Sequence, residues 1–198
     1  MADERLERWL AALIETPGLT ALHDPAAAGR VHLEDALGAA PLLEDGPVVD
    51  VGSGGGSPGL PLAAVRPDLR FDLLESSRKK CAFLERWAVE FPNASVVCAR
   101  AEDHARSVGR DAYGTALARA LAPPPVAAEW CLPLVRPGGR LVLFVGPSAD
   151  EEGVEKVALL LAAEREEAAP GFILLRKTGA TPERFPRRPG MARKRPLA

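Results

Sequence analysis

The feature that most constrains the fold is the segment VVDVGSGGGSPGLPLA, from Val48 to Ala63. A short apolar run enters a cluster of glycines, and Pro58 then opens a helical pattern that continues to Val65. Glycine permits positive φ and lacks the β-carbon that would keep a ligand away from the backbone. Proline suits the start of a helix, where its missing N–H is not needed. The order predicts a strand, a tight turn and a helix that together hold a ligand.

Strand and helix patterns alternate after this turn. This alternation predicts a parallel sheet that is covered by helices on both faces. The predicted strands are 48–51, 70–75, 96–98, 113–118, 141–145 and 172–176, and the predicted helices are 58–65, 77–91, 101–108, 126–135 and 149–168.

Two helical patterns precede the turn, at 6–14 and 30–43, and predict a small N-terminal helical cap. We therefore expect one domain, 1–198, with the cap at 1–45, an α/β core at 46–178 and a basic tail at 179–198. The tail is rich in Pro and Arg, and its composition predicts poor order.

Length and composition favour a single domain with a sizeable core, because the 198 residues are 47% hydrophobic. No apolar run reaches the roughly 20 residues that cross a bilayer, and the acidic start MADERLERWLAALIE does not resemble a secretory signal. These features predict a cytoplasmic protein without a membrane partner, which we expect to be a monomer. The odd number of cysteines, with no metal-type spacing, predicts reduced core residues at Cys81, Cys98 and Cys131 and no metal site.

Charge is divided unevenly along the chain. The formal charge is −2, but from Gly171 onward eight Lys or Arg accompany one acid, Glu183, for +7. The first 170 residues hold 17 basic and 26 acidic residues, or −9. A basic end on an acidic body is either a solubilising tail or a way to reach a phosphate backbone.

Two carboxylates indicate which ligand the turn holds. The glycine spacing also matches, from Gly54 to Gly59, the pattern of dinucleotide sites such as those for NAD. Asp50 ends the first strand, where a carboxylate would repel a pyrophosphate but attract the cationic amino group of S-adenosylmethionine. Glu75 ends the second strand, where carboxylates accept hydrogen bonds from ribose hydroxyls. Together they favour S-adenosylmethionine over NAD. Glu102, after the third strand, would meet an adenine edge, or is an acid at a solvated helix start.

Several segments then resemble one family. They are DVGSGGGSPGLPLA, LLESSRKKCAFLER, ARAED, ALARALAPP and KTGATPERFPRRPGMARKRPL, with GLTALHDP and VHLEDAL before the turn. In this order they resemble the bacterial 16S ribosomal RNA guanine-N7 methyltransferases. The resemblance implies a Rossmann-like class I S-adenosylmethionine-dependent methyltransferase fold, with a mostly parallel seven-stranded sheet, and a guanine of 16S ribosomal RNA in the small subunit as the acceptor.

The resemblance also implies roles for individual residues. The methionine part of the donor would be wrapped by Gly52, Ser53, Gly54 and Gly56, with Gly59 completing the motif. Glu75 and Ser76 would contact the ribose, and Ala101 and Glu102 would flank the adenine. Arg119 matches an arginine near the reaction site; the alternative is a surface salt bridge.

Departures from the family pattern fall on the acceptor side. Gly114 and Ala118 stand where the family usually has Asp and Ser, Val145 where it has Lys, and Gly18 where it has Asn. A lysine and an aspartate near the site are thus absent. The alternatives are a relative that methylates another RNA or a small molecule, and a binding module without turnover.

The chemistry of guanine N7 needs no general base, because N7 carries an in-plane lone pair and no proton. Alignment and exclusion of water are sufficient. Neither a cytosine-C5 nor an exocyclic-adenine site is indicated: no cysteine lies in a suitable loop after the fourth strand, and the segment Ala122–Pro125 has prolines without a stacking ring. We interpret that segment as a rigid turn that starts a helix.

Two further groups of residues are predicted to contact RNA. His32 and Asp35 lie three apart on one face of the cap, where they shape the acceptor pocket or form a buried structural pair. The tail supplies cations and a ring, Phe185, that could stack on a base. The cations are Arg184, Arg187, Arg188, Arg193, Lys194 and Arg195.

Overall fold

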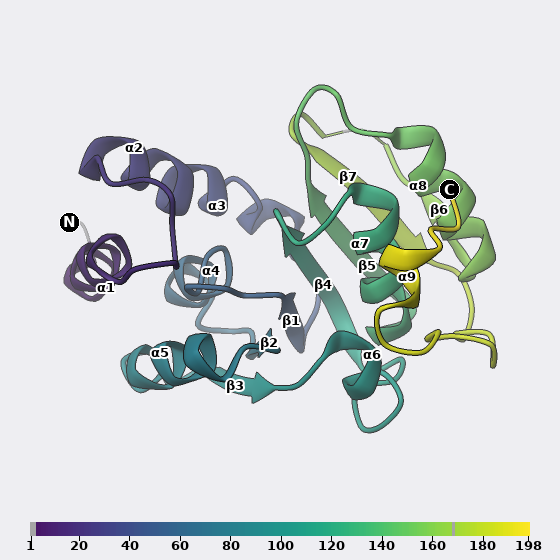
Figure 1. The fold of residues 1–198 in the computed structure, drawn as a ribbon, viewed down its shortest axis with the longest axis horizontal. Helices are drawn as coiled ribbons and strands as arrows, with labels where there is room; N and C mark the ends of the chain where they lie inside the picture. The colour runs from purple at the N-terminus through teal and green to yellow at the C-terminus, as the bar shows by residue number, and fades with distance from the viewer. Residues whose placement is uncertain (1–2, 168) are drawn as a thin grey trace.

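The computed structural model describes residues 3–167 and 169–198, which form a three-layer α/β structure (Figure 1). Its sheet has seven strands in the order β3-β2-β1-β4-β5-β7-β6. Five neighbouring strands are parallel, and β7 and β6 are added antiparallel at one edge. The strands are β1 Val48–Val51, β2 Phe71–Glu75, β3 Ala94–Cys98, β4 Tyr113–Arg119, β5 Val135–Phe144, β6 Ala163–Arg165 and β7 Phe172–Lys177.

Helices cover both faces of this sheet, as the alternation predicted. On one face, the cap face, lie α4 Gly59–Val65, α5 Arg78–Ala88 and the N-terminal helices; on the other lie α6 Ala101–His104, α7 Pro124–Cys131 and α8 Glu151–Leu160. Strand β1 carries apolar side chains on both faces. Val48 packs with the cap-face helices, whereas Val49 and Val51 join the core on the opposite face. Side chains alternate with a period of two along a strand, so every residue of a central strand is buried.

The N-terminal cap is a chain of short helices (Figure 1). Its elements are α1 Glu4–Glu15, α2 Pro25–Gly29, the π-helical turn η1 Arg30–Glu34, α3 Asp35–Leu37 and the 3₁₀ turn η2 Ala40–Leu42. Helix α1 buries Leu6, Trp9 and Leu13, which share one helical face. The indole N–H of Trp9 donates to the backbone O of Gly55 at 2.8 Å, so α1 is tied to the glycine turn.

The C-terminal segment contradicts the prediction of poor order. Residues 179–198, here called the strap, run back across the α7 side of the sheet and include α9 Met191–Lys194, which packs against α7 (Figure 1). Lys177, fully buried at the root of the strap, donates to Asp111 and Thr181 at 3.2 and 2.6 Å. Arg110 donates to the backbone O of Phe185 at 2.7 Å. These internal contacts replace the backbone solvation that a disordered tail would have.

Other differences concern element boundaries. Strand β6 was not predicted, because the residues 163–165 were assigned to a helix at 149–168; α8 ends at Leu160. Pro58 occupies the N-cap position of α4, one residue before the helix begins, instead of the first helical position. The turn at Ala122–Pro125 does start a helix, as predicted. In the described residues, no helix is both long and apolar enough to cross a membrane.

Candidate functional site

The glycine turn lies at the carboxyl end of β1, in the middle of the sheet. Gly52 and Gly54 have φ of +71° and +59°, in the left-handed region that favours glycine. A β-carbon at Gly52 would collide with the side chain of Leu121, whereas one at Gly54 would have space. The N–H groups of Gly52 and Ser53 donate to the backbone O of Leu74 at 2.7 and 3.1 Å, so the start of the turn extends the β1–β2 pairing.

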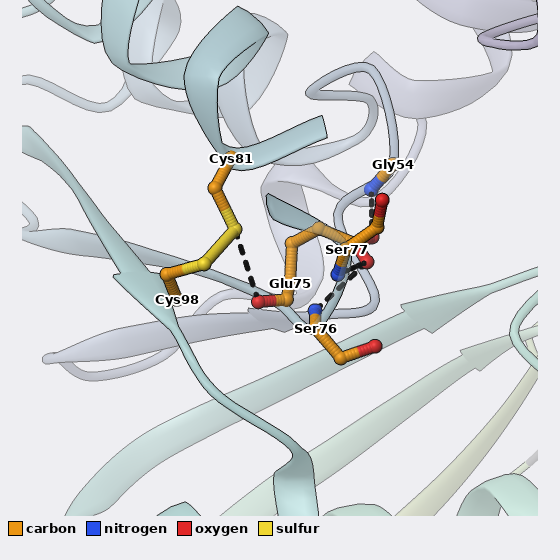
Figure 2. Close-up of a disulfide and its surroundings, with 6 residues drawn as sticks. All are labelled: Gly54, Glu75, Ser76, Ser77, Cys81 and Cys98. Atoms are coloured by element: carbon orange, nitrogen blue, oxygen red, sulfur yellow. Dashed lines mark hydrogen bonds between the residues drawn. A yellow bond between two sulfur atoms is a disulfide. The ribbon is translucent and has the colours of Figure 1, made fainter. Parts of the chain in front are cut away.

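Glu75 anchors the turn from the neighbouring strand (Figure 2). Its carboxylate accepts from the N–H groups of Gly54, Ser76 and Ser77 at 3.0, 2.8 and 2.8 Å. A carboxylate has about four acceptor positions, so one position remains for a ligand hydroxyl. Glu75 is only 7% exposed.

Asp50 lies beneath the turn and faces the start of α4. Its side chain is 1% exposed and accepts from the N–H of Gly59 at 3.0 Å. Burial raises the pKa of this carboxyl to about 6, although the Gly59 and Ser53 hydrogen bonds and the charge of Arg119 oppose the shift. The predicted contact with a donor amino group stays a prediction, because the visible role of Asp50 is to cap α4.

Gly56 and Gly59 serve packing in this structure. A β-carbon at Gly56 would approach Leu60 and Leu84, and one at Gly59 would approach Leu73 and Asp50. These two glycines therefore allow α4 and α5 to lie close to the sheet.

A disulfide overturns the expectation that all three cysteines are reduced. Cys81 of α5 and Cys98 at the end of β3 are bonded to each other, and the sulfur of Cys81 lies 3.3 Å from the backbone O of Glu75 (Figure 2). The seventeen-residue separation hid the pair, because β3 returns beside β2 only in the folded sheet. Cys131 is a free, buried thiol, as expected, and burial raises its pKa.

Arg119 ends β4 on the cap face and is held from the cap. It donates to the backbone O of Val31, to Nδ1 of His32 at 3.0 Å and to the backbone O of Ser57 at 3.4 Å. Burial lowers the pKa of Arg119, opposed by the carboxylates of Asp50 and Asp35. The surface salt bridge considered as an alternative is therefore wrong: Arg119 is an internal, oriented cation.

The tautomer of His32 follows from its partners. Arginine only donates, so Nδ1 of His32 is the acceptor and Nε2 carries the proton, which it donates to Oγ1 of Thr20 at 3.0 Å. Burial, together with the charge of Arg119, lowers the pKa of His32 to about 4. His32 is therefore neutral near pH 7 and acts as a support for Arg119.

Three neighbouring cavities, which share lining residues, follow the carboxyl ends of the strands. We name them by position: the strap cavity beside α6, α7 and the strap, the turn cavity over the glycines, and the cap cavity between the cap and β5. Gly52 lines both the strap and the turn cavities, and Arg119 and Ala120 line both the turn and the cap cavities. The cap cavity is the largest of the three, at about 700 Å³, which is within the range of small-molecule sites.

Ten of the predicted site residues line these cavities, whereas Asp50, Gly56, Gly59 and Glu75 are not among the lining residues. The strap cavity is lined by Gly52, Ser76, Ala101, Glu102 and Arg193, the turn cavity by His32, Gly52, Ser53, Gly54 and Arg119, and the cap cavity by Asp35 and Arg119. His32 and Asp35 thus face different cavities, with Arg119 lining both. Sequence reasoning missed Lys80, Leu121, Trp130, Phe144 and Gly190, which also line the cavities. Their residue types are those of ordinary core or surface positions, so the sequence carries no signal for them.

The strap residues have two kinds of surroundings. The exposed cations are Arg184, Arg188, Arg193, Lys194 and Arg195. Arg187 instead forms a bidentate ion pair with Glu129, at 2.5 and 2.6 Å. Phe185 is 3% exposed and cannot stack on a base, contrary to the prediction.

Gly114 and Val145, two of the positions that depart from the family pattern, lie in different parts of the structure. Gly114 is the second residue of β4, five residues from Arg119, or about 16 Å along an extended strand. A β-carbon there would meet the backbone of Asp45 and Gly46. Gly114 therefore cannot represent an aspartate lost from the acceptor side. Val145 does line the cap cavity.

Methyltransferases resemble this chain both in sequence and in fold. The family model described as rRNA small subunit methyltransferase G matches residues 3–172. Relatives of the same name include those of Synechococcus elongatus, 38% identical over 90% of this chain and 82% of the relative, and Symbiobacterium thermophilum, 40% identical over 92% and 84%. Among solved structures, a geranyl diphosphate methyltransferase in complex with SAM aligns with a TM-score of 0.61 and 12% identity over 85% of this chain and 95% of that one. An O-methyltransferase from Thermotoga maritima aligns with a TM-score of 0.55 and 15% identity, over 76% and 67%.

The fold is that of the class I S-adenosylmethionine-dependent methyltransferases. The family model and the relatives identify one family within this class. The model covers most of the chain, and the similarity extends over most of each relative. The chain belongs to the rRNA small subunit methyltransferase G family.

Proposed function

We propose that this protein transfers a methyl group from S-adenosylmethionine to N7 of a guanine in 16S ribosomal RNA, acting in the cytoplasm as a monomer. The observation that carries the proposal is that the three cavities adjoin one another, with Gly52 lining the first two and Arg119 the last two. An adenosine, a methionine and an acceptor base require three adjoining compartments in this order. Family membership and the names of the relatives support the same reaction.

The donor fits the strap and turn cavities. Ser76, Ala101 and Glu102 would surround the nucleoside, and the open acceptor position of Glu75 would take a ribose hydroxyl. The backbone of the glycine turn would hold the methionine part, with Lys80 of the same cavity as a cation for its carboxylate. When bound, the sulfonium supplies an activated methyl group.

The acceptor fits the cap cavity. Three of the five N–H donors of Arg119 are used by Val31, His32 and Ser57, which leaves two for the base. One of these could bond to guanine O6 and leave the N7 lone pair free. Phe144, whose ring centroid lies 5.9 Å from the Arg119 guanidinium carbon, and Phe172 provide an apolar wall. Asp35 could accept from the N1–H and amino group of guanine, which adenine does not present in that arrangement.

The reaction needs alignment more than proton transfer. His32 is neutral with its lone pair directed at Arg119, so it is not available as a base. Its role, with Thr20 and Val31, is to hold the guanidinium in one orientation. Positioning of this kind can supply several kcal/mol of a barrier, about 7–11 in favourable cases.

The test is methyl transfer from labelled S-adenosylmethionine to small ribosomal subunits that lack the modification, followed by mapping of the modified base. We expect one labelled guanine in 16S ribosomal RNA, modified at N7. Absence of label, under conditions where a relative from the same family is active, would contradict the proposal. Label at a pyrimidine or an adenine would contradict the acceptor assignment alone.

A further inference from the structure

We propose that the strap is a wall of the donor site, and that Glu129 and Arg187 are positioning residues for the donor although neither lines the cavity. The proposal rests on the donor assignment made above. Gly190 and Arg193 of the strap line the strap cavity together with Glu102 of α6 and Trp130 of α7. The nucleoside end of the site is therefore completed by a segment that is more than a hundred residues beyond the glycine turn.

The ion pair between Glu129 and Arg187 fixes this segment. Glu129 is 3% exposed, and its two oxygens accept from Nε and Nη2 of Arg187 at 2.5 and 2.6 Å. The same Nη2 donates to the backbone O of Arg195 at 2.9 Å, beyond α9. A buried carboxylate is strongly destabilising without its partner, and a two-point fork defines both distance and direction. Arg187 is thus located by α7 and in turn holds both ends of the strap segment that carries Gly190.

Further contacts hold the strap against the residues that line the strap cavity. The N–H of Gly190 donates to Oε1 of Glu102 at 3.0 Å, and Gly190 has a φ of +80°. Arg193 stacks over the Trp130 ring, 5.2 Å from its centroid, and donates to the backbone O of Leu121 at 3.4 Å. Glu102, Leu121 and Trp130 all line the cavity. Displacement of Arg187 would therefore loosen the strap at the points where it meets the nucleoside site.

The sequence interpretation assigned Arg187 to RNA. The structure favours a different role, because direct RNA contact by its guanidinium would break an ion pair with a buried acid. Arg188, the next residue, is exposed and remains part of the basic surface. Neighbouring arginines thus separate two functions, one directed inward to the donor and one outward to the phosphate backbone.

Calorimetric titration with S-adenosylhomocysteine tests the proposal at a temperature well below unfolding. We expect Glu129→Gln to raise the Kd at least tenfold. Arg187→Lys keeps the charge without the fork, and we expect a smaller rise in Kd. The matched control is Glu166→Gln, which breaks a similar fork with Arg140 of β5 and a contact with Arg176, outside the three cavities; its Kd should stay within twofold of wild type.

The outcomes separate this proposal from the function on which it rests. An unchanged Kd in a folded Glu129→Gln or Arg187→Lys protein, even with a lower Tm, would overturn the positioning role. If Glu129→Gln does not fold, Arg187→Lys decides alone, and its KM for S-adenosylmethionine should rise while kcat and the KM for RNA stay unchanged. A rise in the KM for RNA alone would restore Arg187 to the RNA surface. Wild-type protein that binds no S-adenosylhomocysteine would instead remove the donor assignment itself.

Discussion

Nη2 of Arg119 lies 3.0 Å from Nδ1 of His32, and this contact joins the end of β4 to the helical cap. Because His32 also donates to Thr20, the guanidinium is oriented by a chain of two side chains. Under the proposed function, the acceptor side of the site would therefore be built by the cap, and the donor side by the glycine turn and the strap.

Replacement of Arg119 by lysine should lower kcat/KM for ribosomal RNA by about 100-fold, because an ammonium cannot reproduce the three oriented bonds of the guanidinium. The Kd for S-adenosylhomocysteine should remain within threefold of wild type. Steady-state kinetics at saturating donor and calorimetry measure the two quantities. Lys80→Arg is a control that retains a cation in the turn cavity, and it should keep most of the activity. Equal losses of donor binding and activity in Arg119→Lys would assign Arg119 to the donor instead.

Asp50 should make wild-type stability depend on pH in a defined direction. Its pKa is raised from 3.8 to about 6 in the folded protein, so the native state retains the proton longer than the unfolded state does. The contribution is fully present below about pH 4 and is lost as the pH rises through 6. Relative to Asp50→Asn, wild type should therefore lose about 3 kcal/mol in the free energy of unfolding between pH 4 and 7. Urea unfolding at several pH values measures this difference.

The exposed residue Asp103 provides the control for that series. Asp103→Asn removes one carboxylate from the surface of α6 and controls for the loss of a negative charge. A constant difference for Asp50→Asn would mean that the carboxyl of Asp50 is hydrated in solution.

The disulfide predicts a thiol count. Protein unfolded without reductant should titrate one thiol, that of Cys131, and three after reduction. Cys98→Ser should lower the free energy of unfolding by about 3 kcal/mol in the absence of reductant, since the bond closes a loop of roughly seventeen residues. In dithiothreitol the variant and wild type should unfold alike. Three titratable thiols in unreduced protein would contradict the bond.

Salt dependence should identify the outer surface of the strap. Arg188→Gln should reduce the slope of log Kd against log salt by about 0.7–0.9, the value for one phosphate contact, with 16S ribosomal RNA as the ligand. The control is Arg8→Gln on α1, which removes an exposed cation at 58% side-chain exposure from the other end of the molecule. An identical slope for both variants would place the RNA elsewhere.

The parts of the fold that could be predicted are those encoded by local patterns. Hydrophobic periodicity encodes the strand, glycine turn and helix at Val48–Val65 and the alternation that follows. The structure accordingly has five parallel strands. Strand β6 has only three residues beside a helix of similar composition, so periodicity could not separate them. The strap looked disordered because its stabilising partners, Asp111 and Arg110, lie about seventy residues away.

The site shows the same limit. The glycine turn and Arg119 were found because their residue types are unusual in context, or because a family motif includes them. Glu129 and Trp130 look like ordinary helix residues, and Cys81 and Cys98 like core cysteines; what distinguishes them is the partner that the tertiary structure brings to each. Asp50 was recognised as important, but its direction toward Gly59 depends on the alternation of side chains along β1.

The bond from Trp9 to Gly55 limits how the molecule can be shortened. A version trimmed to begin at β1 would keep every strand yet leave the Gly55 carbonyl and the Leu13 contact of the turn open to solvent. Engineers seeking a minimal catalytic unit should therefore retain α1, since this helix is a brace for the glycine turn.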